Sequence, residues 1–286
     1  MKSGIVALAG RPNVGKSTLV NAILATKVAI VSDKPQTTRR RVLGVTTTSG
    51  YQLVLADVPG SQRPRDELTG RMQQTVERAF DEVDGILLVL AVSEMIGGGD
   101  RFIASLAFGA GVPVVIALNK TDVCRPDLIA RQTLQAAALG DFHALHPVSA
   151  KTGDGVGALR EELVGLLPDG PALFPDEATS DLTVKEQIAE LIREKALQVT
   201  REEVPHATTV EVGEIAGAVV RADVIVETES QKRILVGRAG SMIRDIGTKA
   251  RPEIEQLLGM TVHLELMVKV RRRWRADDAM LSRLGI

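Results

Sequence analysis

One stretch near the start of the chain constrains its fold more than any other. A short apolar run over residues 5–9 precedes it, and a helical pattern over residues 18–24 follows it. The stretch reads Gly10-Arg11-Pro12-Asn13-Val14-Gly15-Lys16-Ser17, which has the form GxxxxGK[ST]. Its glycines let successive backbone N–H groups turn inward, and the helix N-terminus adds partial positive charge. This strand–loop–helix unit therefore predicts a phosphate-binding loop in an α/β domain.

The residue types in the loop suggest how a nucleotide would be held. We expect Lys16 to reach the β- and γ-phosphates and the Ser17 hydroxyl to bind Mg²⁺. The backbone of the loop and of the first helical turn should contact the phosphates. The expected contacts are Gly10, Arg11, Pro12, Asn13, Val14, Gly15, Lys16, Ser17 and Thr18.

A second motif, Asp57-Val58-Pro59-Gly60, follows a strand pattern over residues 51–56. We expect Asp57 to hold Mg²⁺ through water, and the N–H of Gly60 to sense the γ-phosphate. Between the two motifs lies Gln36-Thr37-Thr38-Arg39-Arg40, where a threonine can complete the magnesium shell when the γ-phosphate is present. Thr38 is the preferred candidate for this metal ligand, and Thr37 is the alternative.

The residues expected to select the nucleotide base lie about a hundred positions further along the chain. A buried-strand pattern over residues 112–118 ends in Asn119-Lys120-Thr121-Asp122. Asp122 is acceptor-only, so it suits the N1–H and 2-amino group of guanine. Adenine would leave this carboxylate unpaired, at a cost of about 1–3 kcal/mol. Guanine is therefore the expected base, with Asn119 joining the loops and the stem of Lys120 covering the ring.

A further strand pattern over residues 144–148 ends in Ser149-Ala150-Lys151. The backbone N–H of Ala150 is a candidate donor to guanine O6. Because the carboxyl ends of parallel strands meet at one edge of a sheet, all of these motifs should form one site.

Strands alternate with helical patterns from residue 4 to about 167, with helices expected near 67–80, 99–109, 127–139 and 156–167. This βαβ pattern predicts a doubly wound, mostly parallel sheet. Three prolines and a glycine within residues 168–175 then indicate a linker. We expect a nucleotide-binding domain at 1–168, a linker at 169–182 and a smaller domain at 183–286.

The second domain is expected to be α+β. A helical pattern over 184–199 is followed by strand patterns over 208–215 and 219–227, two helices, and a strand over 262–270. The two later helices are joined by Gly237-Arg238-Ala239-Gly240. A GxxG loop between helices is typical of KH modules, where it clamps the backbone of about four nucleotides.

Local charge agrees with binding of a polyanion. The whole chain carries a net charge of −1, but residues 232–275 hold eleven Lys/Arg and four Asp/Glu, net +7. Residues 181–229 hold five Lys/Arg and eleven Asp/Glu, net −6. We expect RNA contacts from the loop glycines with Arg238, Ala239, Arg244, Lys249 and the cluster Arg271-Arg272-Arg273-Trp274-Arg275, whose tryptophan could stack on bases.

The composition of the chain indicates the cellular compartment in which we expect it. No apolar run approaches the roughly 20 residues of a membrane span. Met1-Lys2-Ser3-Gly4 leads directly into the first strand pattern, so no signal peptide is expected. The single cysteine, Cys124, excludes an internal disulfide and suits a reducing cytosol.

Together these motifs resemble those of the Era family of bacterial GTPases. The residues that carry the resemblance are GRPNVGKS, QTTRR, DVPG, NKTD and SAK, followed by VGRAG, IRDIG and HLELMVKV in the second domain. The resemblance implies a P-loop GTPase domain followed by a KH domain, and binding and hydrolysis of GTP to GDP with Mg²⁺. It also implies binding to the 3′ end of 16S ribosomal RNA, a role in assembly of the small (30S) subunit, and peripheral contact with the inner face of the cell membrane. We expect a cytoplasmic monomer.

Two positions depart from the family pattern. Ser61 and then Gln62 follow Gly60, so the glutamine is displaced by one position from where many GTPases use one to orient water. In the loop, Arg238 stands where a lysine is common. In related GTPases an asparagine at the position of Asn13 helps hold a potassium ion, so K⁺ is a candidate cofactor; alternatively, Asn13 only caps the loop.

Three alternative functions agree less well with the sequence. A GTPase of tRNA modification would carry a C-terminal cysteine and an extra helical domain, and an assembly GTPase with two G domains would repeat the phosphate loop; the sequence has neither. A membrane-surface signalling switch without an RNA target would suit the charge of residues 232–275, but would leave the GxxG order unexplained.

Overall fold

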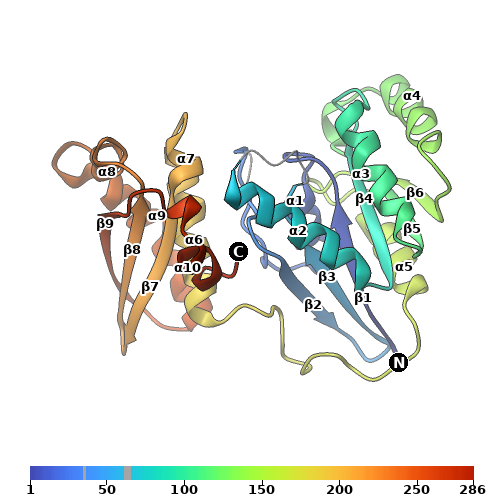
Figure 1. The fold of residues 1–286 in the computed structure, drawn as a ribbon. Coiled ribbons are helices and arrows are strands. Elements are labelled where there is room, and N and C mark those ends of the chain that lie inside the picture. Colours follow the sequence, from blue (N-terminus) through green and yellow to red (C-terminus); the bar gives the residue numbers. More distant parts are fainter. Residues whose placement is uncertain (35–36, 61–65) are drawn as a thin grey trace. The chain divides into compact units, whose positions relative to one another are not determined.

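A computed structural model of the chain describes residues 1–34, 37–60 and 66–286. Apart from two short segments, contacts within the chain divide it into a first compact unit that ends at Asp181 and a second that begins at Leu182. Figure 1 shows the first unit in blue to green and the second in yellow to red.

The first unit contains a six-stranded sheet in the order β2-β3-β1-β4-β5-β6. The β2–β3 pair is antiparallel and every other pair is parallel, as the alternating pattern predicts. The strands are β1 (Lys2–Ala9), β2 (Val42–Thr47), β3 (Tyr51–Asp57), β4 (Gly85–Ala91), β5 (Val114–Asn119) and β6 (Ala144–Pro147). The helices are α1 (Lys16–Leu24), α2 (Glu67–Asp81), α3 (Gly98–Gly109), α4 (Pro126–Ala137) and α5 (Val156–Leu166).

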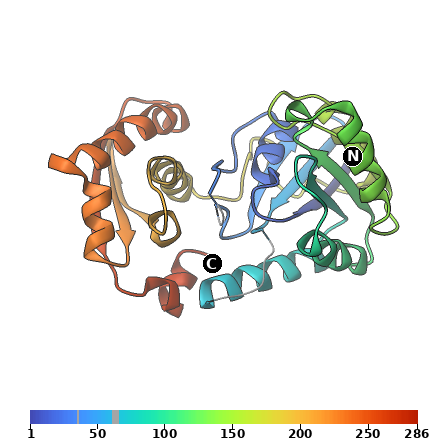
Figure 2. The ribbon, with the colours of Figure 1, turned by 90° about the horizontal axis from the view of Figure 1, so that it is seen from above.

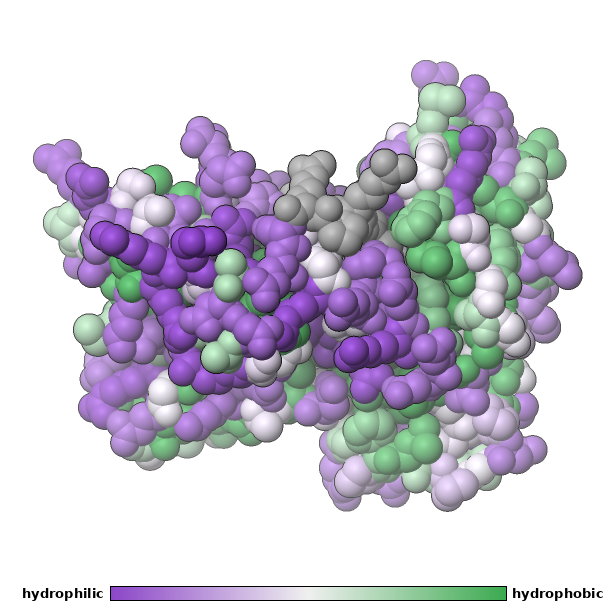
Figure 3. Space-filling view, viewed as in Figure 1, coloured by the Kyte–Doolittle hydropathy of each residue, from purple (hydrophilic) through white to green (hydrophobic). Residues whose placement is uncertain are grey.

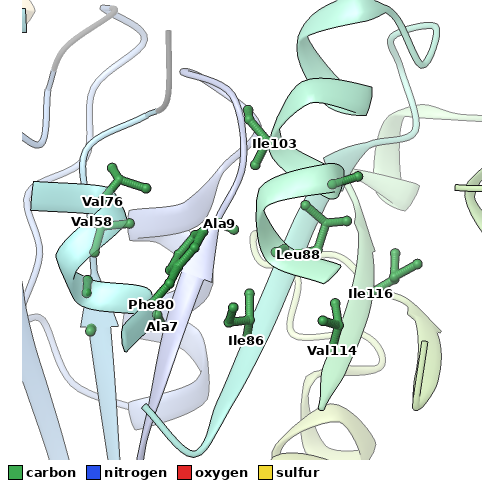
Figure 4. Packing of buried hydrophobic residues seen from close by; sticks show 14 of the residues in the cluster. Ala7, Ala9, Val58, Val76, Phe80, Ile86, Leu88, Ile103, Val114 and Ile116 are labelled. Carbon is green, nitrogen blue, oxygen red and sulfur yellow. The ribbon is translucent and has the colours of Figure 1, made fainter. Parts of the chain in front are cut away.

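Helices cover both faces of this sheet, because alternate residues of each strand point to opposite faces. Ala7 and Ala9 of β1 face a core formed with α2, α3 and α4, to which Phe80 and Ile103 contribute (Figure 4). Val6 and Leu8, which alternate with them along β1, face a second core, formed with α1 and α5. The view from above shows the sheet between these two layers of helices (Figure 2). This arrangement leaves the carboxyl ends of the parallel strands free to carry the loops of a site.

The second unit is a three-stranded sheet, in the order β7-β8-β9, packed against helices. The β7–β8 pair is antiparallel and the β8–β9 pair is parallel. Its main elements are α6 (Val184–Val199), β7 (Thr209–Ala216), β8 (Val219–Val226), α8 (Glu229–Val236), α9 (Ser241–Leu258) and β9 (His263–Val270). Two short helices, α7 (Val204–Ala207) and α10 (Asp278–Arg283), were not predicted from the sequence. The predicted order of helix, two strands, two helices and strand is confirmed.

The chain beyond residue 168, which the sequence predicts to be a linker, is hydrogen-bonded to the first unit. The buried carboxamide of Gln52 accepts bonds from the backbone N–H groups of Leu173 (2.6 Å) and Phe174 (2.9 Å) through its oxygen, and donates to the Phe174 carbonyl (2.9 Å). Ser180 forms an antiparallel bridge with Gly44 at the free edge of β2. The segment therefore covers that sheet edge, while the domain limits expected at 168 and 183 stay predictions.

The surfaces of the two units differ in polarity. In the space-filling view, apolar side chains gather on the side of the first unit that carries α3, whereas the second unit shows mostly hydrophilic side chains (Figure 3). Phe102 of α3 is 47% exposed and Met95, in the preceding loop, is 75% exposed. Within the described part of the chain, no helix combines the length and apolar content that crossing a membrane requires.

Candidate nucleotide site and RNA-binding loop

The phosphate-loop motif connects β1 to α1, as its sequence setting predicts. Gly15 has a φ of +96°, and a side chain there would run into the amide of Asn119. A side chain at Gly10 would lie 2.6 Å from the carbonyl oxygen of Val89. Both positions therefore require glycine, because the loop curls tightly against neighbouring strand ends.

Lys16 is buried inside the loop. Its Nζ donates to the carbonyls of Gly10 (3.0 Å) and Arg11 (3.1 Å). Burial lowers the pKa of Lys16 to about 8, although the nearby Asp57 opposes this shift. An ammonium group in such a desolvated place gains strongly from a phosphate anion.

Three oxygen-bearing side chains meet at the end of β3. The hydroxyls of Ser17 (2.7 Å) and Thr38 (3.1 Å) both donate to Oδ2 of Asp57, and the two hydroxyl oxygens lie 3.1 Å apart. The other carboxylate oxygen, Oδ1, is buried without a hydrogen-bond partner among the described residues. Burial raises the pKa of Asp57, against the opposing effects of Lys16 and the two hydroxyls. Oxygen donors with one unsatisfied carboxylate oxygen fit Mg²⁺, which prefers oxygen ligands.

The structure distinguishes the two candidate threonines. Thr38 faces Asp57, whereas the hydroxyl of Thr37 donates to the carbonyl of Lys34 at 2.6 Å. The arrangement of these hydroxyls thus favours Thr38 over Thr37 as the candidate metal ligand. Gln62, the glutamine displaced by one position from that of many GTPases, lies outside the described residues.

Gly60 lies directly against the phosphate loop. A side chain at this position would lie 2.8 Å from the backbone nitrogen of Pro12 and 2.9 Å from its Cα. Only glycine can let the Asp57–Gly60 segment approach the loop this closely. The backbone at Gly60 is therefore close enough to respond to the state of the phosphate site.

Asn119, at the end of β5, joins three loops. Its Nδ2 donates to the carbonyl of Val14 at 2.9 Å, and its Oδ1 accepts from the N–H of Ala150 at 3.0 Å. The predicted role of Asn119 in tying loops together is thus visible in the geometry. The same geometry differs from the expectation for Ala150, whose N–H is bonded to Asn119 rather than open toward a base.

The carboxylate of Asp122 is held by a neighbouring hydroxyl. Ser149 Oγ donates to Asp122 Oδ1 at 2.8 Å and accepts from the N–H of Thr152 at 3.1 Å. Ser149 thus holds one of the two carboxylate oxygens of Asp122. Lys120 has a left-handed backbone with a φ of +70°, and Lys151 is exposed. The structure therefore brings the two base-recognition motifs together.

Sequence reasoning missed two acidic residues next to this site. Arg11 bonds through Nε to Asp100 at 2.7 Å and through a terminal nitrogen to Glu94 at 2.8 Å. Burial lowers the pKa of Arg11, but its bonds to these two carboxylates outweigh that effect and raise it. The available signal was two acidic residues after the carboxyl end of β4, Glu94 in the loop and Asp100 in the first turn of α3, at the same sheet edge as the other motifs.

The GxxG loop of the second unit lies between α8 and α9. Gly237 and Gly240 have φ values of +71° and +76°, and a side chain at 237 would lie 2.8 Å from the backbone nitrogen of Met242. Arg238 and Ala239 are exposed between them, and Arg244 is exposed one turn into α9. The loop therefore presents backbone groups and positive charge to solvent.

Two expectations for the basic cluster are corrected by the structure. Trp274 is fully buried and donates from Nε1 to the carbonyl of Ala207 at 2.8 Å, so it anchors the chain and cannot stack on bases. Arg271 is paired with Asp277 at 2.6 Å, and Arg275 with Glu227 at 2.8 Å. Their charges are thus largely compensated.

The remaining expected RNA contacts of this part of the chain are exposed, and they differ in whether they are ion-paired. Arg272 and Arg273 are exposed, and neither forms an ion pair with another described residue. Lys249 is exposed and paired with Asp245 one turn before it, at 2.7 Å. The basic side chains that remain free for a polyanion are therefore fewer than the sequence count predicts.

Comparison with known proteins agrees with both parts of the chain. A family model described as a 50S ribosome-binding GTPase matches residues 5–120, and a KH-domain model matches residues 203–275. A curated protein of Nocardioides sp. (strain ATCC BAA-499 / JS614), named GTPase Era, is 44% identical over 300 residues, which cover 99% of this chain and 96% of the relative. The chain belongs to the Era family of GTPases. The fold and the activity that the motifs predict, GTP hydrolysis by a P-loop domain followed by a KH domain, are confirmed.

Two solved Era structures match the whole chain. One is Aquifex aeolicus Era, as a variant bound to GDP.AlF4-, with a TM-score of 0.93 and 36% identity; it covers 100% of this chain and 99% of that chain. The other is Era in complex with MgGDPNP and nucleotides 1506-1542 of 16S ribosomal RNA, with the same TM-score, identity and coverage.

Proposed function

We propose that this GTPase binds GTP with Mg²⁺ in its first unit and binds the 3′ end of 16S ribosomal RNA through the GxxG loop of its second unit. The observation that carries the proposal is the pairing of a guanine-type base site with an open GxxG loop in one chain. It is supported by the related Era structure with MgGDPNP and nucleotides 1506-1542 of 16S ribosomal RNA. The process that it serves is assembly of the small (30S) ribosomal subunit.

In the proposed nucleotide site each group has one task. Lys16 neutralises the β- and γ-phosphates, and Ser17, Thr38 and Asp57 hold Mg²⁺. When bound, Mg²⁺ supplies charge neutralisation at the phosphates. The N–H of Gly60 senses the γ-phosphate, and Asp122 selects guanine. The buried, unsatisfied Oδ1 of Asp57 and the Ser149–Asp122 bond support these assignments.

The chemical step in this proposal is electrostatic and slow. Positioned cations lower the barrier where charge develops on the transferred phosphoryl group, and Lys16→Ala removes one of them. Asn13 lies in the loop with a left-handed backbone, φ +66°. We propose that it helps hold K⁺ near the phosphates; the alternative is a capping role only. Equal GTPase rates in potassium and sodium buffers would remove the potassium proposal.

The RNA side of the proposal rests on the exposed backbone of the loop. Gly237 and Gly240 let phosphates approach the backbone and the N-terminus of α9, while exposed arginines supply charge. Affinity should fall steeply with salt, because each neutralised phosphate releases counterions. We further propose that the protein acts as a cytoplasmic monomer with peripheral contact at the inner face of the membrane.

The decisive experiment compares two glycine variants in filter binding to the 3′-terminal 16S RNA fragment. Gly240→Asp places a carboxylate where phosphate must lie, and RNA affinity should fall strongly while GTP hydrolysis persists. Gly217→Asp is the matched control: it also has a positive φ, +57°, and open space around it. It lies in the β7–β8 turn, at the far end of the sheet from α8 (Figure 1). Equal RNA affinity in both variants would refute the role of the loop.

The same variants test the membrane alternative. Anionic vesicles replace the RNA fragment in a second series of binding measurements. A wild type that binds vesicles and not the RNA would favour a membrane-surface switch over ribosomal RNA binding.

A further inference from the structure

The side chain of Arg11, in the phosphate loop, is held by two carboxylates that follow β4 in the chain. Asp100 accepts from its Nε at 2.7 Å and Glu94 accepts from its terminal nitrogen at 2.8 Å. Gly99 lies beneath it, since a side chain there would lie 2.9 Å from Arg11 Cδ. The loop after β4 and the first turn of α3 therefore leave room for this arginine and supply its two partners.

The two carboxylates are anchored differently. Asp100 is a buried side chain, 3% exposed, and its Oδ2 caps α3 by accepting from the N–H of Gly97 at 2.9 Å. Glu94 is fixed through its backbone. Its N–H donates to the carbonyl of Ala91 at 3.1 Å, and its carbonyl accepts from Gln132 Nε2, on α4, at 3.1 Å. A fixed backbone limits where the Glu94 carboxylate can lie.

Glu94 also reaches the base-recognition motif. Its Oε1 lies 3.9 Å from Nζ of Lys120, while Oε2 holds Arg11. Lys120 has a left-handed backbone, so its side chain leaves the chain in a different direction from that of a residue in an extended strand. One carboxylate thus contacts a cation from the phosphate loop and a cation from the base loop.

We propose that Glu94 is a positioning residue for bound nucleotide: it holds Arg11 and Lys120 together and so couples the phosphate and base ends of the site. Asp100 supports it by fixing Arg11. The stem of Lys120 covers the guanine ring only while its ammonium is held to one side of the site. When the ion pair between Glu94 and Lys120 is lost, bound nucleotide should dissociate faster, whereas its association rate should change little.

The primary test is the rate at which a fluorescent GDP analogue leaves the intact protein when chased with unlabelled GDP. Glu94→Gln keeps the shape and removes the charge, and dissociation should become about 3–10-fold faster, the range expected for two partly exposed ion pairs. Association should change less than about 2-fold. Glu161→Gln on α5 is the matched control, an exposed glutamate of the same unit that should leave both rates unchanged.

A double-mutant cycle separates positioning from a general structural role. Lys120→Met keeps the stem and removes the ammonium, so adding Glu94→Gln to it should have a smaller effect than in the wild type. High salt should move the wild type toward Glu94→Gln, because the ion pairs are partly exposed. Thermal unfolding without nucleotide shows whether a variant has lost its fold. If Glu94→Gln does not fold, Asp100→Asn gives the same test through Arg11.

Two results would overturn the inference: a dissociation rate for folded Glu94→Gln equal to that of the wild type, or fully additive effects in the cycle. A wild type that fails to retain GDP would contradict the nucleotide site itself. The first two results concern Glu94 alone and the last concerns the wild type, so failure of this inference can be told from failure of the proposed nucleotide site.

Discussion

The side-chain amide of Asn119 donates a 2.9 Å hydrogen bond to the backbone carbonyl of Val14, 105 residues earlier in the chain. The same side chain accepts from the N–H of Ala150 at 3.0 Å. All three groups are buried, so water cannot replace a lost partner. One carboxamide therefore sets the distance between the phosphate loop and both base-recognition loops.

Replacing this side chain should affect stability and nucleotide binding together. Asn119→Ala leaves a buried carbonyl and a buried N–H unpaired, and should lower the free energy of unfolding by about 2–4 kcal/mol. Nucleotide affinity should fall as well, because the loops lose their common support. Denaturant unfolding and GDP titration measure the two effects. Asn119→Asp keeps the acceptor for Ala150 but sets a buried carboxylate oxygen against the Val14 carbonyl, so it should be destabilised as well. Equal stability of Asn119→Ala and wild type would contradict the account.

Base selectivity should depend on the carboxylate of Asp122. Asp122→Asn can keep the bond from Ser149 through its amide oxygen, and then presents an NH₂ group where guanine also offers donors. GTP binding should weaken by about 2–4 kcal/mol, and xanthosine triphosphate should become the better ligand. Competition titration with the two nucleotides checks this. A wild type that bound ATP and GTP equally well would show that guanine is not selected here.

Nucleotide affinity should depend on pH through Lys16. Burial lowers the pKa of its ammonium to about 8 in the free protein, and bound phosphates favour the charged form and raise it again. Below this pKa the lysine is charged in both states and affinity should be flat. Above it binding must take up a proton, so affinity should fall as pH rises, by at most about tenfold per unit.

Calorimetric titration in buffers of different ionisation enthalpy measures this proton uptake directly. Uptake should be small at pH 7 and approach one proton well above pH 8. Binding without proton uptake at high pH would mean that Lys16 does not meet the phosphates as an ammonium.

Features that depend on local sequence were predictable. The helix expected over 184–199 has those bounds, because Thr183 caps it with Glu186 and its apolar residues recur at helical spacing. The phosphate loop followed in the same way from glycines placed between a strand and a helix. Thr38 could be preferred over Thr37 only weakly, since the direction of each hydroxyl depends on how the chain returns to Asp57.

Features that depend on distant packing were not predictable from one sequence. Glu94 and Asp100 lie more than 80 residues from Arg11, so no local pattern announces their bonds. Gln52 is similar, because its role becomes visible only when the segment near Phe174 returns to the sheet edge. Trp274 stands among arginines in the sequence, which suggested an exposed stacking surface, but an indole that can bury its ring and satisfy its N–H is more stable inside.

That burial gives the last prediction. Trp274→Ala should lower the free energy of unfolding by about 3–5 kcal/mol, the usual cost of removing a large aromatic side chain from a packed interior. Trp274→Phe keeps most of the ring volume but leaves the Ala207 carbonyl without its partner, and should cost about 1–3 kcal/mol. If Trp274 instead stacked on RNA, both variants would unfold like the wild type and Trp274→Ala would bind RNA less tightly. Denaturant unfolding and RNA titration separate the two cases, with the titration done at a temperature where Trp274→Phe is fully folded. The buried indole predicts unchanged RNA affinity for Trp274→Phe. By contrast, Arg272→Ala and Arg273→Ala change exposed positions and should weaken RNA binding without lowering stability.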